Sequence, residues 1–165
     1  MIKRRNFLQY SASLSLMASI PRQAFAAGGV KAAISESDLV YITPIQSNGK
    51  ESSCQSEVWF VNDGTDMYVV TASNAWRATA PGKGLTRARL WIGDLGEWKA
   101  TNGKYKSLPQ VDAEAVVISD AKLKEKALDM FGDKYSMEWL VWGSRFRKGL
   151  GDGSRTLLRY RPMIS

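Results

Sequence analysis

The chain has 165 residues and a formal net charge of +7, with one cysteine and no histidine. The missing histidine excludes Ser-His-Asp and Cys-His catalysis within the chain, and it excludes histidine-ligated zinc and a proximal histidine to haem. The single cysteine, Cys54, can form neither an internal disulfide nor a cysteine-rich metal site. We therefore predict no metal site.

The first 26 residues are typical of a twin-arginine export signal. Paired arginines precede a Phe-Leu pair (residues 4–8), a short apolar segment follows (10–20), and Ala24-Phe25-Ala26 is a small-residue cleavage site. The apolar segment is shorter than the ~20 residues that span a bilayer, so we expect no stable membrane anchor. We predict recognition by the twin-arginine export machinery, cleavage near Ala26, and a single periplasmic or secreted domain over residues 27–165.

Cleavage would also lower the charge. The signal contains Lys3, Arg4, Arg5 and Arg22 but no acidic residue, so the net charge would fall from +7 to +3. This mild excess is weak support for a nucleic-acid partner. Basic residues near the C-terminus are expected to form a solvated face, and we predict no nucleic-acid binding.

The first elements of the mature chain are short. Residues 30–37 are expected to form a lead-in with a turn of helix. Residues 39–45 have the composition of a strand, and Pro44 places it at a sheet edge or marks the strand's end. The polar residues 46–56 indicate a loop that contains Asn48-Gly49.

The central part of the chain, residues 56–94, predicts a hairpin followed by a short basic helix and another strand. Asn62-Asp63-Gly64 supplies the turn, and residues 67–71 form a β-rich run. Ser73-Asn74 provides two good N-caps for the helix. A helix start beside several cations is a plausible phosphate cradle, because backbone N–H groups and the helix dipole favour an anion there.

The remaining elements alternate strands with two helices. Asp120 is expected to cap a helix that Gly132 ends. We predict first a hairpin across residues 95–107 with its turn at 101–103. A strand follows over 110–119, with Val111, Ala113, Ala115 and Val117 on its buried face. After it we predict helices over 121–131 and 136–148, a turn at 149–153 and a strand over 154–160. The total of about six or seven strands and two or three helices favours a mainly β fold with α (α+β), a small barrel with helices packed on it.

Several segments carry a resemblance to a known superfamily. These are Glu57–Phe60, the Asp-Gly turn, Tyr68–Thr71, Ser73–Arg77 and Ala88–Gly93. Together they resemble the split-barrel flavin-binding proteins, which include pyridoxamine-phosphate-oxidase-like and deazaflavin-dependent nitroreductase-like members, over roughly residues 39–161. The resemblance implies a split β-barrel, FMN or deazaflavin as cofactor, and a homodimer with the site at its interface.

The resemblance also indicates which residues would hold the cofactor. Arg77 stands where the family places a phosphate-binding Lys or Arg, although Ala78-Thr79-Ala80 follows where more cations are expected. Trp76 would either line the flavin pocket or pack in the core. The candidate cofactor-binding residues are Thr71, Ser73, Asn74, Trp76, Arg77, Lys83 and Arg87, with Trp91 as a further candidate for the ring pocket and Lys50 as a weaker one for cofactor contact.

Two functional hypotheses follow. The first is an exported flavin-dependent oxidoreductase that acts on an unknown small-molecule substrate, with its catalytic residues unassigned. The cofactor would carry the hydride chemistry, so the absence of histidine and of a paired-acid motif is compatible with it. The alternative is a non-catalytic split-barrel binding module of the periplasm, either cofactor-free or ligand-binding.

Overall fold

The computed structural model describes residues 27–164, so the predicted export signal (1–26) lies outside the described residues. Seven strands form one antiparallel sheet: β1 (Leu39–Pro44), β2 (Ser56–Trp59), β3 (Val61–Asn62), β4 (Met67–Ala72), β5 (Arg87–Ile92), β6 (Gln110–Ile118) and β7 (Arg155–Pro162). Their order in the sheet is β2-β1-β5-β6-β7-β4-β3.

The sheet curls into a nearly closed barrel. Its two edge strands, β2 and β3, are successive pieces of one chain segment and are separated only by Phe60. One segment can serve as both edges only if the sheet bends until its ends meet. The Asn62-Asp63-Gly64 turn then returns the chain into β4, which pairs Met67 with Asn62. The predicted α+β fold is confirmed.

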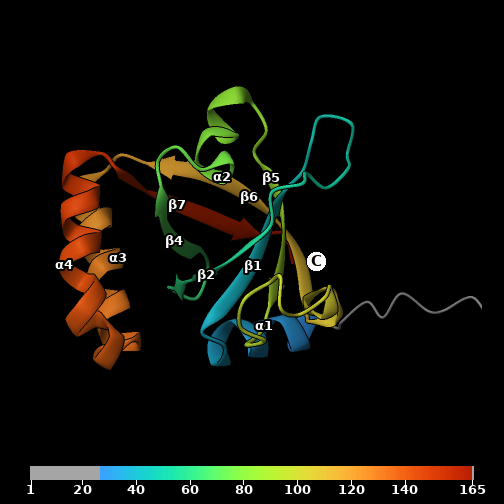
Figure 1. Cartoon of the computed structure of the whole chain (residues 1–165), viewed down its shortest axis with the longest axis horizontal. Coiled ribbons are helices and arrows are strands. Elements are labelled where there is room, and N and C mark those ends of the chain that lie inside the picture. Colours follow the sequence, from blue (N-terminus) through green and yellow to red (C-terminus); the bar gives the residue numbers. More distant parts are fainter. Residues whose placement is uncertain (1–26, 165) are drawn as a thin grey trace, which may run out of the picture.

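Four α-helices surround the barrel: α1 (Ala27–Glu36), α2 (Trp76–Thr79), α3 (Ala121–Lys134) and α4 (Ser136–Asp152). Figure 1 shows α3 and α4 side by side at one edge of the molecule, with α4 outermost, and α1 across the foot of the barrel. The short α2 follows β4 directly. None of the helices in this part of the chain is long and apolar enough to cross a bilayer.

The barrel interior is the first of three apolar cores. Alternate residues of neighbouring strands point inward, because successive strand side chains face opposite sides. Val30 and Ile34 of α1 close the lower end. The strand residues of this core are Val40, Ile42, Met67, Val69, Ala88, Leu90, Ile92, Val111, Ala113, Ala115, Leu158 and Tyr160, with Phe60 from the β2–β3 junction.

The second core lies between the sheet and the α3–α4 pair. The Asp120 side chain caps α3 by accepting a hydrogen bond from the Leu123 N–H at 2.7 Å, as predicted. Buried residues of the helices are Ala127, Leu128, Phe131, Tyr135, Phe146 and Leu150, and they pack on Val61, Tyr68, Val70, Ile118 and Leu157 of the strands. Strands β4 and β7 therefore have both faces covered.

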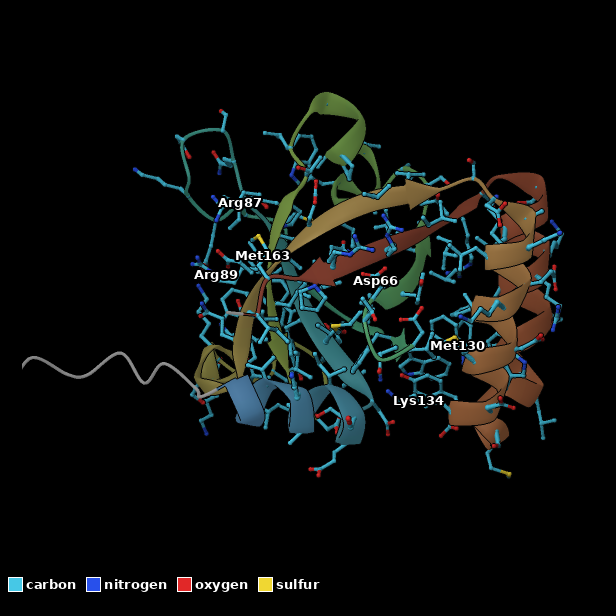
Figure 2. All side chains as sticks on the ribbon, turned by 180° about the vertical axis from the view of Figure 1, so that it is seen from behind. Asp66, Arg87, Arg89, Met130, Lys134 and Met163 are labelled. Atoms are coloured by element: carbon cyan, nitrogen blue, oxygen red, sulfur yellow. The ribbon has the colours of Figure 1, made fainter. Side chains whose placement is uncertain are left out.

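Tyr135 and Lys134 fasten these helices to the barrel. The Tyr135 hydroxyl lies 2.7 Å from the Asp38 carbonyl oxygen and accepts the Phe60 N–H at 3.0 Å. The Lys134 ammonium donates to the carbonyl oxygens of Ser37 at 2.6 Å and Phe60 at 3.0 Å. Lys134 lies between α3 and the sheet in Figure 2. These bonds tie the end of α3 to the start of β1 and to the β2–β3 junction.

The predicted hairpin across residues 95–107 is wrong. Residues 104–107 form a short 3-10 helix, and Asn102 and Gly103 have positive φ angles of 49° and 82°. The turn is thus present, but the flanking segments cover the outer face of β1 and β5 instead of pairing as strands. Tyr105 packs there against Tyr41 and Trp91 to make the third core.

The predicted helix ends also need correction. Gly132 lies inside α3, where a Cβ atom would come 3.0 Å from the Trp139 ring nitrogen. Glycine at this position therefore admits the indole of α4 instead of ending the helix. Helix α4 continues through Gly149 to Asp152, and only Gly153, with φ of 78°, takes the left-handed conformation of a C-cap.

Two strand details differ from expectation. β1 is not a sheet edge, because it pairs with both β2 and β5; Pro44 instead marks its end. In β6 the buried alternation holds through Ala115 but fails at Val117, whose side chain is 42% exposed, while Ile118 is buried.

Candidate functional site

Arg77 lies half-buried in α2, with its guanidinium directed at two hydroxyl groups. Its Nε donates to Thr71 Oγ1 at 2.8 Å, and its Nη1 donates to Ser56 Oγ at 2.5 Å. Thr71 comes from β4 and Ser56 from β2, so two strands and a helix hold one cation. The two hydroxyl groups fix the direction of the guanidinium without neutralising its charge.

Arg77 differs from Arg89 in its partners. Arg89 is paired with two carboxylates, Asp112 at 2.9 Å and Glu51 at 3.1 Å. Arg77 forms no ion pair within residues 27–164; its side-chain partners there are neutral. A half-buried cation without a counter-charge favours an anion nearby, because burial strengthens electrostatic attraction.

A groove of about 420 Å³ is lined by Trp76, the neighbour of Arg77 in α2, and we call it the Arg77 groove; Arg77 itself is not among the lining residues. Trp76, the neighbour of Arg77, supplies its aromatic wall, and Leu85 adds an apolar contact. The loop before β2 supplies the polar side, with Gln46, Ser47, Ser52, Ser53 and Cys54. The groove thus combines an indole, hydroxyl groups and a thiol next to a cation.

Tyr160 of β7 adds a phenol close to this site. Its side chain is 1% exposed, and burial raises the pKa of its hydroxyl well above the usual value. The positive charge of Arg77 opposes that rise, and the thiol of Cys54 adds to it. Tyr160 therefore stays protonated at neutral pH and lies within electrostatic reach of both groups.

Lys83 also belongs to this region. Its ammonium lies 4.9 Å from the centroid of the Trp76 ring, a cation–π arrangement. The side chain therefore covers part of the Trp76 indole. The structure brings Thr71, Trp76, Arg77 and Lys83 together, four of the seven predicted site residues.

The predicted helix cap is wrong, and this weakens the idea of a helix-dipole cradle. The N-cap of α2 is Ala75, which makes no side-chain cap bond, and the helix has only four residues. The Ser73 hydroxyl instead donates to the Gly153 carbonyl oxygen at 2.7 Å, which joins the end of β4 to the turn before β7. Asn74 is exposed. Any anion here would be held by side chains.

Arg87 does not line the groove. Its guanidinium contacts Asp112 at 3.1 Å, and 59% of the side chain is exposed. Figure 2 places Arg87 and Arg89 together at one edge of the molecule, at the side opposite Lys134. Their shared partner Asp112 explains this position, because it faces both arginines from the adjacent strand β6.

Trp91 and Lys50 also lie outside the groove lining. Trp91 is 1% exposed; its indole N–H donates to Gln110 Oε1 at 3.1 Å, and its ring meets Tyr105 edge to face. It is on the outer face of β5, under the connection that precedes β6. Lys50 is exposed in the loop 46–55, which contributes five other residues to the groove lining.

Glu51 organises the charge at the base of that loop. Burial alone would raise the pKa of its carboxyl, but the bonds and charges of Lys106 and Arg89 outweigh burial and hold the pKa below its usual range. Lys106 lies 2.8 Å from Glu51. This network fixes the loop relative to β5 without using Arg77.

Sequence reasoning missed Ser56 and Tyr160, and it gave Cys54 no role. Ser56 and Tyr160 approach Arg77 only after the barrel closes, since they come from β2 and β7. No local pattern marks them as partners of a residue in α2.

Within the described residues, no cluster of His, Cys, Asp or Glu could hold a metal ion.

Comparisons of the whole structure identify a shared fold. HutZ, a haem storage protein from Vibrio cholerae, is 16% identical with a TM-score of 0.55, over 82% of this chain and 89% of that chain. Protein Rv2991 from Mycobacterium tuberculosis is 14% identical with a TM-score of 0.55, over 82% and 79%. A candidate 5-nitroimidazole antibiotic resistance protein from Bacteroides thetaiotaomicron is 10% identical with a TM-score of 0.53, over 81% and 78%.

No protein-family model and no curated protein matches the sequence. At identities this low, the structural likeness shows the fold and leaves the activity open. The split β-barrel fold that the resemblance implied is therefore confirmed.

Proposed function

We propose that this chain binds a phosphorylated flavin-type cofactor, FMN or a deazaflavin, in the Arg77 groove and acts as an oxidoreductase on a small molecule. The observation that carries the proposal is the Arg77 guanidinium. It is half-buried, held by the hydroxyls of Thr71 and Ser56, and without a carboxylate partner in the described chain. Such a group suits a phosphate, which can accept charge-assisted hydrogen bonds from it.

The neighbouring residues suit the rest of the cofactor. Trp76 offers an aromatic wall, and the hydroxyls of Ser52 and Ser53 offer polar contacts at the ring edge or ribityl chain. The groove volume of about 420 Å³ lies within the usual range of small-molecule sites. When bound, a flavin would supply the hydride-transfer chemistry, so the chain needs only to bind it, orient it and exclude water.

Location and assembly belong to the same proposal. A twin-arginine signal carries folded proteins, so a cofactor could be loaded before export to the periplasm. By resemblance, a homodimer would complete the cofactor site. The likeness to a haem storage protein suggests a second ligand class, but this chain has no histidine to ligate haem iron.

The first experiment is an absorbance spectrum of the full chain, purified without added cofactor and then incubated with FMN or a deazaflavin. We expect flavin-like absorbance and a rise in melting temperature. Ligand at a hundred times its Kd should add about 2.7 kcal/mol to the free energy of unfolding. A protein that stays colourless and gains no stability from either compound would overturn the proposal.

A matched pair of variants tests the site. Arg77→Ala should abolish the ligand-induced shift, whereas Arg87→Ala should keep it, because the Arg87 charge is already paired with Asp112 and its side chain is 59% exposed. Wild-type flavin affinity in Arg77→Ala would refute the site assignment while leaving the fold intact.

A cofactor-free binding module is the second candidate. Lys83 favours it, because its ammonium already covers part of the Trp76 ring and would need to move for a flavin to stack there. Under this alternative the groove takes a smaller anionic ligand. Inorganic phosphate would then raise the melting temperature in an Arg77-dependent way, while flavins would not.

A further inference from the structure

The loop between β1 and β2 (residues 46–55) forms one side of the Arg77 groove. Figure 1 shows this segment projecting from the barrel. The loop contributes most of the lining residues, namely Gln46, Ser47, Ser52, Ser53 and Cys54. The other two, Trp76 and Leu85, belong to α2 and to the segment that precedes β5. The width of the groove therefore depends on where the loop lies.

Most of the bonds in this loop join its own residues to one another. The Gln46 N–H donates to the Lys50 carbonyl oxygen at 2.8 Å, and the Gln46 side-chain amide donates to the Glu51 carbonyl oxygen at 3.2 Å. At its base, the Ser52 N–H donates to the Pro44 carbonyl oxygen at 2.9 Å. Residues 46–50 are all exposed. The loop is thus a small hydrogen-bonded unit with little packing to hold it in place.

Glu51 is the side chain that ties this unit to the rest of the fold. Its Oε1 accepts from Arg89 Nη1 at 3.1 Å, and its Oε2 accepts from Lys106 Nζ at 2.8 Å. Within residues 27–164, no other side chain of the loop forms a hydrogen bond or ion pair outside it. The Glu51 side chain is only 25% exposed, so its ion pairs are screened less than those on an open surface.

The two cations that hold Glu51 are themselves fixed by other contacts. Arg89 donates from its Nε to Asp112 of β6 at 2.9 Å. The Lys106 ammonium lies 5.6 Å from the centroid of the buried Trp91 ring. Neither contact involves the loop, so Glu51 binds to two points that belong to the barrel and its outer cover.

We propose that Glu51 is a positioning residue of the Arg77 groove, because its two ion pairs hold the 46–55 loop against the barrel and keep the polar side of the groove near Trp76. When both pairs are lost, the loop stays joined to β1 and β2 and moves away without unfolding the barrel. The effect on ligand affinity rests on the proposed function, whereas the position of the loop does not.

Cys54 allows the position of the loop to be measured directly. It is the only cysteine of the chain, and it is partly exposed in the groove lining. The measurement is the rate at which the folded full chain reacts with dipyridyl disulfide, an uncharged thiol reagent. Glu51→Lys should raise this rate about fivefold or more, because it replaces two attractions by two repulsions. The matched control is Lys50→Glu, which should react like wild type because the exposed Lys50 side chain forms no ion pair within residues 27–164.

A charge exchange tests the pairing itself. Lys106→Glu should also raise the rate, because it puts a second carboxylate beside Glu51. The double variant E51K/K106E restores opposite charges and should react more slowly than either single variant. A Glu51→Lys protein that reacts like wild type, or a double variant no slower than the singles, would overturn the proposal.

A milder variant covers the case in which charge reversal prevents folding. Glu51→Gln keeps the shape of the side chain and should raise the Cys54 rate about twofold; an unchanged rate would refute the proposal. Chemical denaturation of the same variants separates loop movement from global unfolding. A rate that follows only the loss of global stability would give Glu51 a purely structural role.

FMN distinguishes this inference from the proposed function. Bound FMN should slow the reaction of Cys54 in wild type, and Glu51→Lys should weaken FMN affinity several-fold. If wild type binds no FMN, the proposed function fails, and the Cys54 rates still decide whether Glu51 holds the loop. If Glu51→Lys binds FMN as tightly as wild type does, Glu51 does not position the groove for its ligand.

Discussion

Lys134 and Arg77 are both partly buried cations without a carboxylate partner in the described chain, yet their surroundings differ. Lys134 donates to the main-chain carbonyl oxygens of Ser37 and Phe60, and it covers the Phe60 ring at 3.9 Å. Arg77 donates to the side-chain hydroxyls of Thr71 and Ser56, and its chain neighbour Trp76 lines the Arg77 groove. Burial lowers the pKa of Lys134, and nearby Asp38 and Asp94 only partly oppose that effect.

From this difference we infer that Lys134 is a structural cation, and we propose Arg77 as a binding one. The carbonyl oxygens of Ser37 and Phe60 need donors in the folded chain, and Lys134 serves both, with the Tyr135 hydroxyl as a further donor to Phe60 at 2.8 Å. The hydroxyls beside Arg77 can rotate and find other partners. Removing Lys134 should therefore damage the fold, whereas removing Arg77 should damage binding.

The largest expected effect is on ligand binding in Arg77→Met. The loss of two hydrogen bonds is offset by removal of a partly desolvated charge, so the unfolding free energy of the free protein should change by less than about 1 kcal/mol. The stabilisation of ~2.7 kcal/mol expected from flavin at a hundred times its Kd should disappear. Chemical denaturation with and without FMN measures both. A large loss in the free protein would place Arg77 with the structural cations.

Lys134→Met should lower the unfolding free energy by about 2 kcal/mol, because two buried carbonyl oxygens lose a charged donor. The matched control is Lys126→Met. Its ammonium is 59% exposed and 3.8 Å from Asp63, so that change should cost less than about 0.5 kcal/mol. Equal effects in urea denaturation would show that Lys134 contributes no more than an ordinary surface lysine.

Thr71→Val tests the hydroxyls that direct Arg77. The side chain keeps its shape but loses the acceptor of the Arg77 Nε–H, so we expect a loss of about 1 kcal/mol in stability. Flavin affinity should fall less than in Arg77→Met, because the cation remains. If Thr71→Val abolishes binding while Arg77→Met preserves it, the hydroxyl and not the cation holds the ligand.

The smallest expected effect is on the free energy of unfolding when Arg89 loses one of its two carboxylate partners, Glu51. Glu51→Gln should cost about 0.5 kcal/mol at neutral pH. The pKa of Glu51 is lowered on folding, so its contribution is present above the unfolded value of ~4.3 and is lost as the pH falls through the lowered folded value. The stability difference between wild type and variant should thus shrink below about pH 4. A difference that is constant from pH 7 to pH 3 would contradict this linkage.

Local sequence patterns predicted much of the strand framework and part of the site. Asp120 capped its helix, and the Asn62-Asp63-Gly64 turn joined two strands, because both features depend on near neighbours. Ser56 and Tyr160 were missed because only barrel closure brings them to Arg77. The prediction that Gly132 ends its helix was wrong for a similar reason. Glycine is needed there because the indole of Trp139, which belongs to another helix, occupies the space where a side chain would lie.

The resemblance singled out Trp76, which lines the Arg77 groove, and its neighbour Arg77, but residue types alone could not place all the other candidates. Arg87 and Trp91 lie on strand β5, and each faces its own partner, Asp112 or Tyr105, which sequence distance hides. The sequence indicated Ser73 as a helix cap, but its hydroxyl donates to the carbonyl oxygen of Gly153, which is 80 residues away in the sequence. In each case a tertiary contact decided the role of the side chain.

The barrel's closing segment has a consequence for the timing of folding. Strand β4 pairs on one side with β3, its neighbour in the chain, and on the other with β7, the last strand. The barrel cannot close until β7 has been synthesised and released, so the early strands must wait with their hydrogen-bonding edges unpaired. Such distant pairings slow folding. A nascent chain of this protein should therefore depend on protection against aggregation until β7 has left the ribosome.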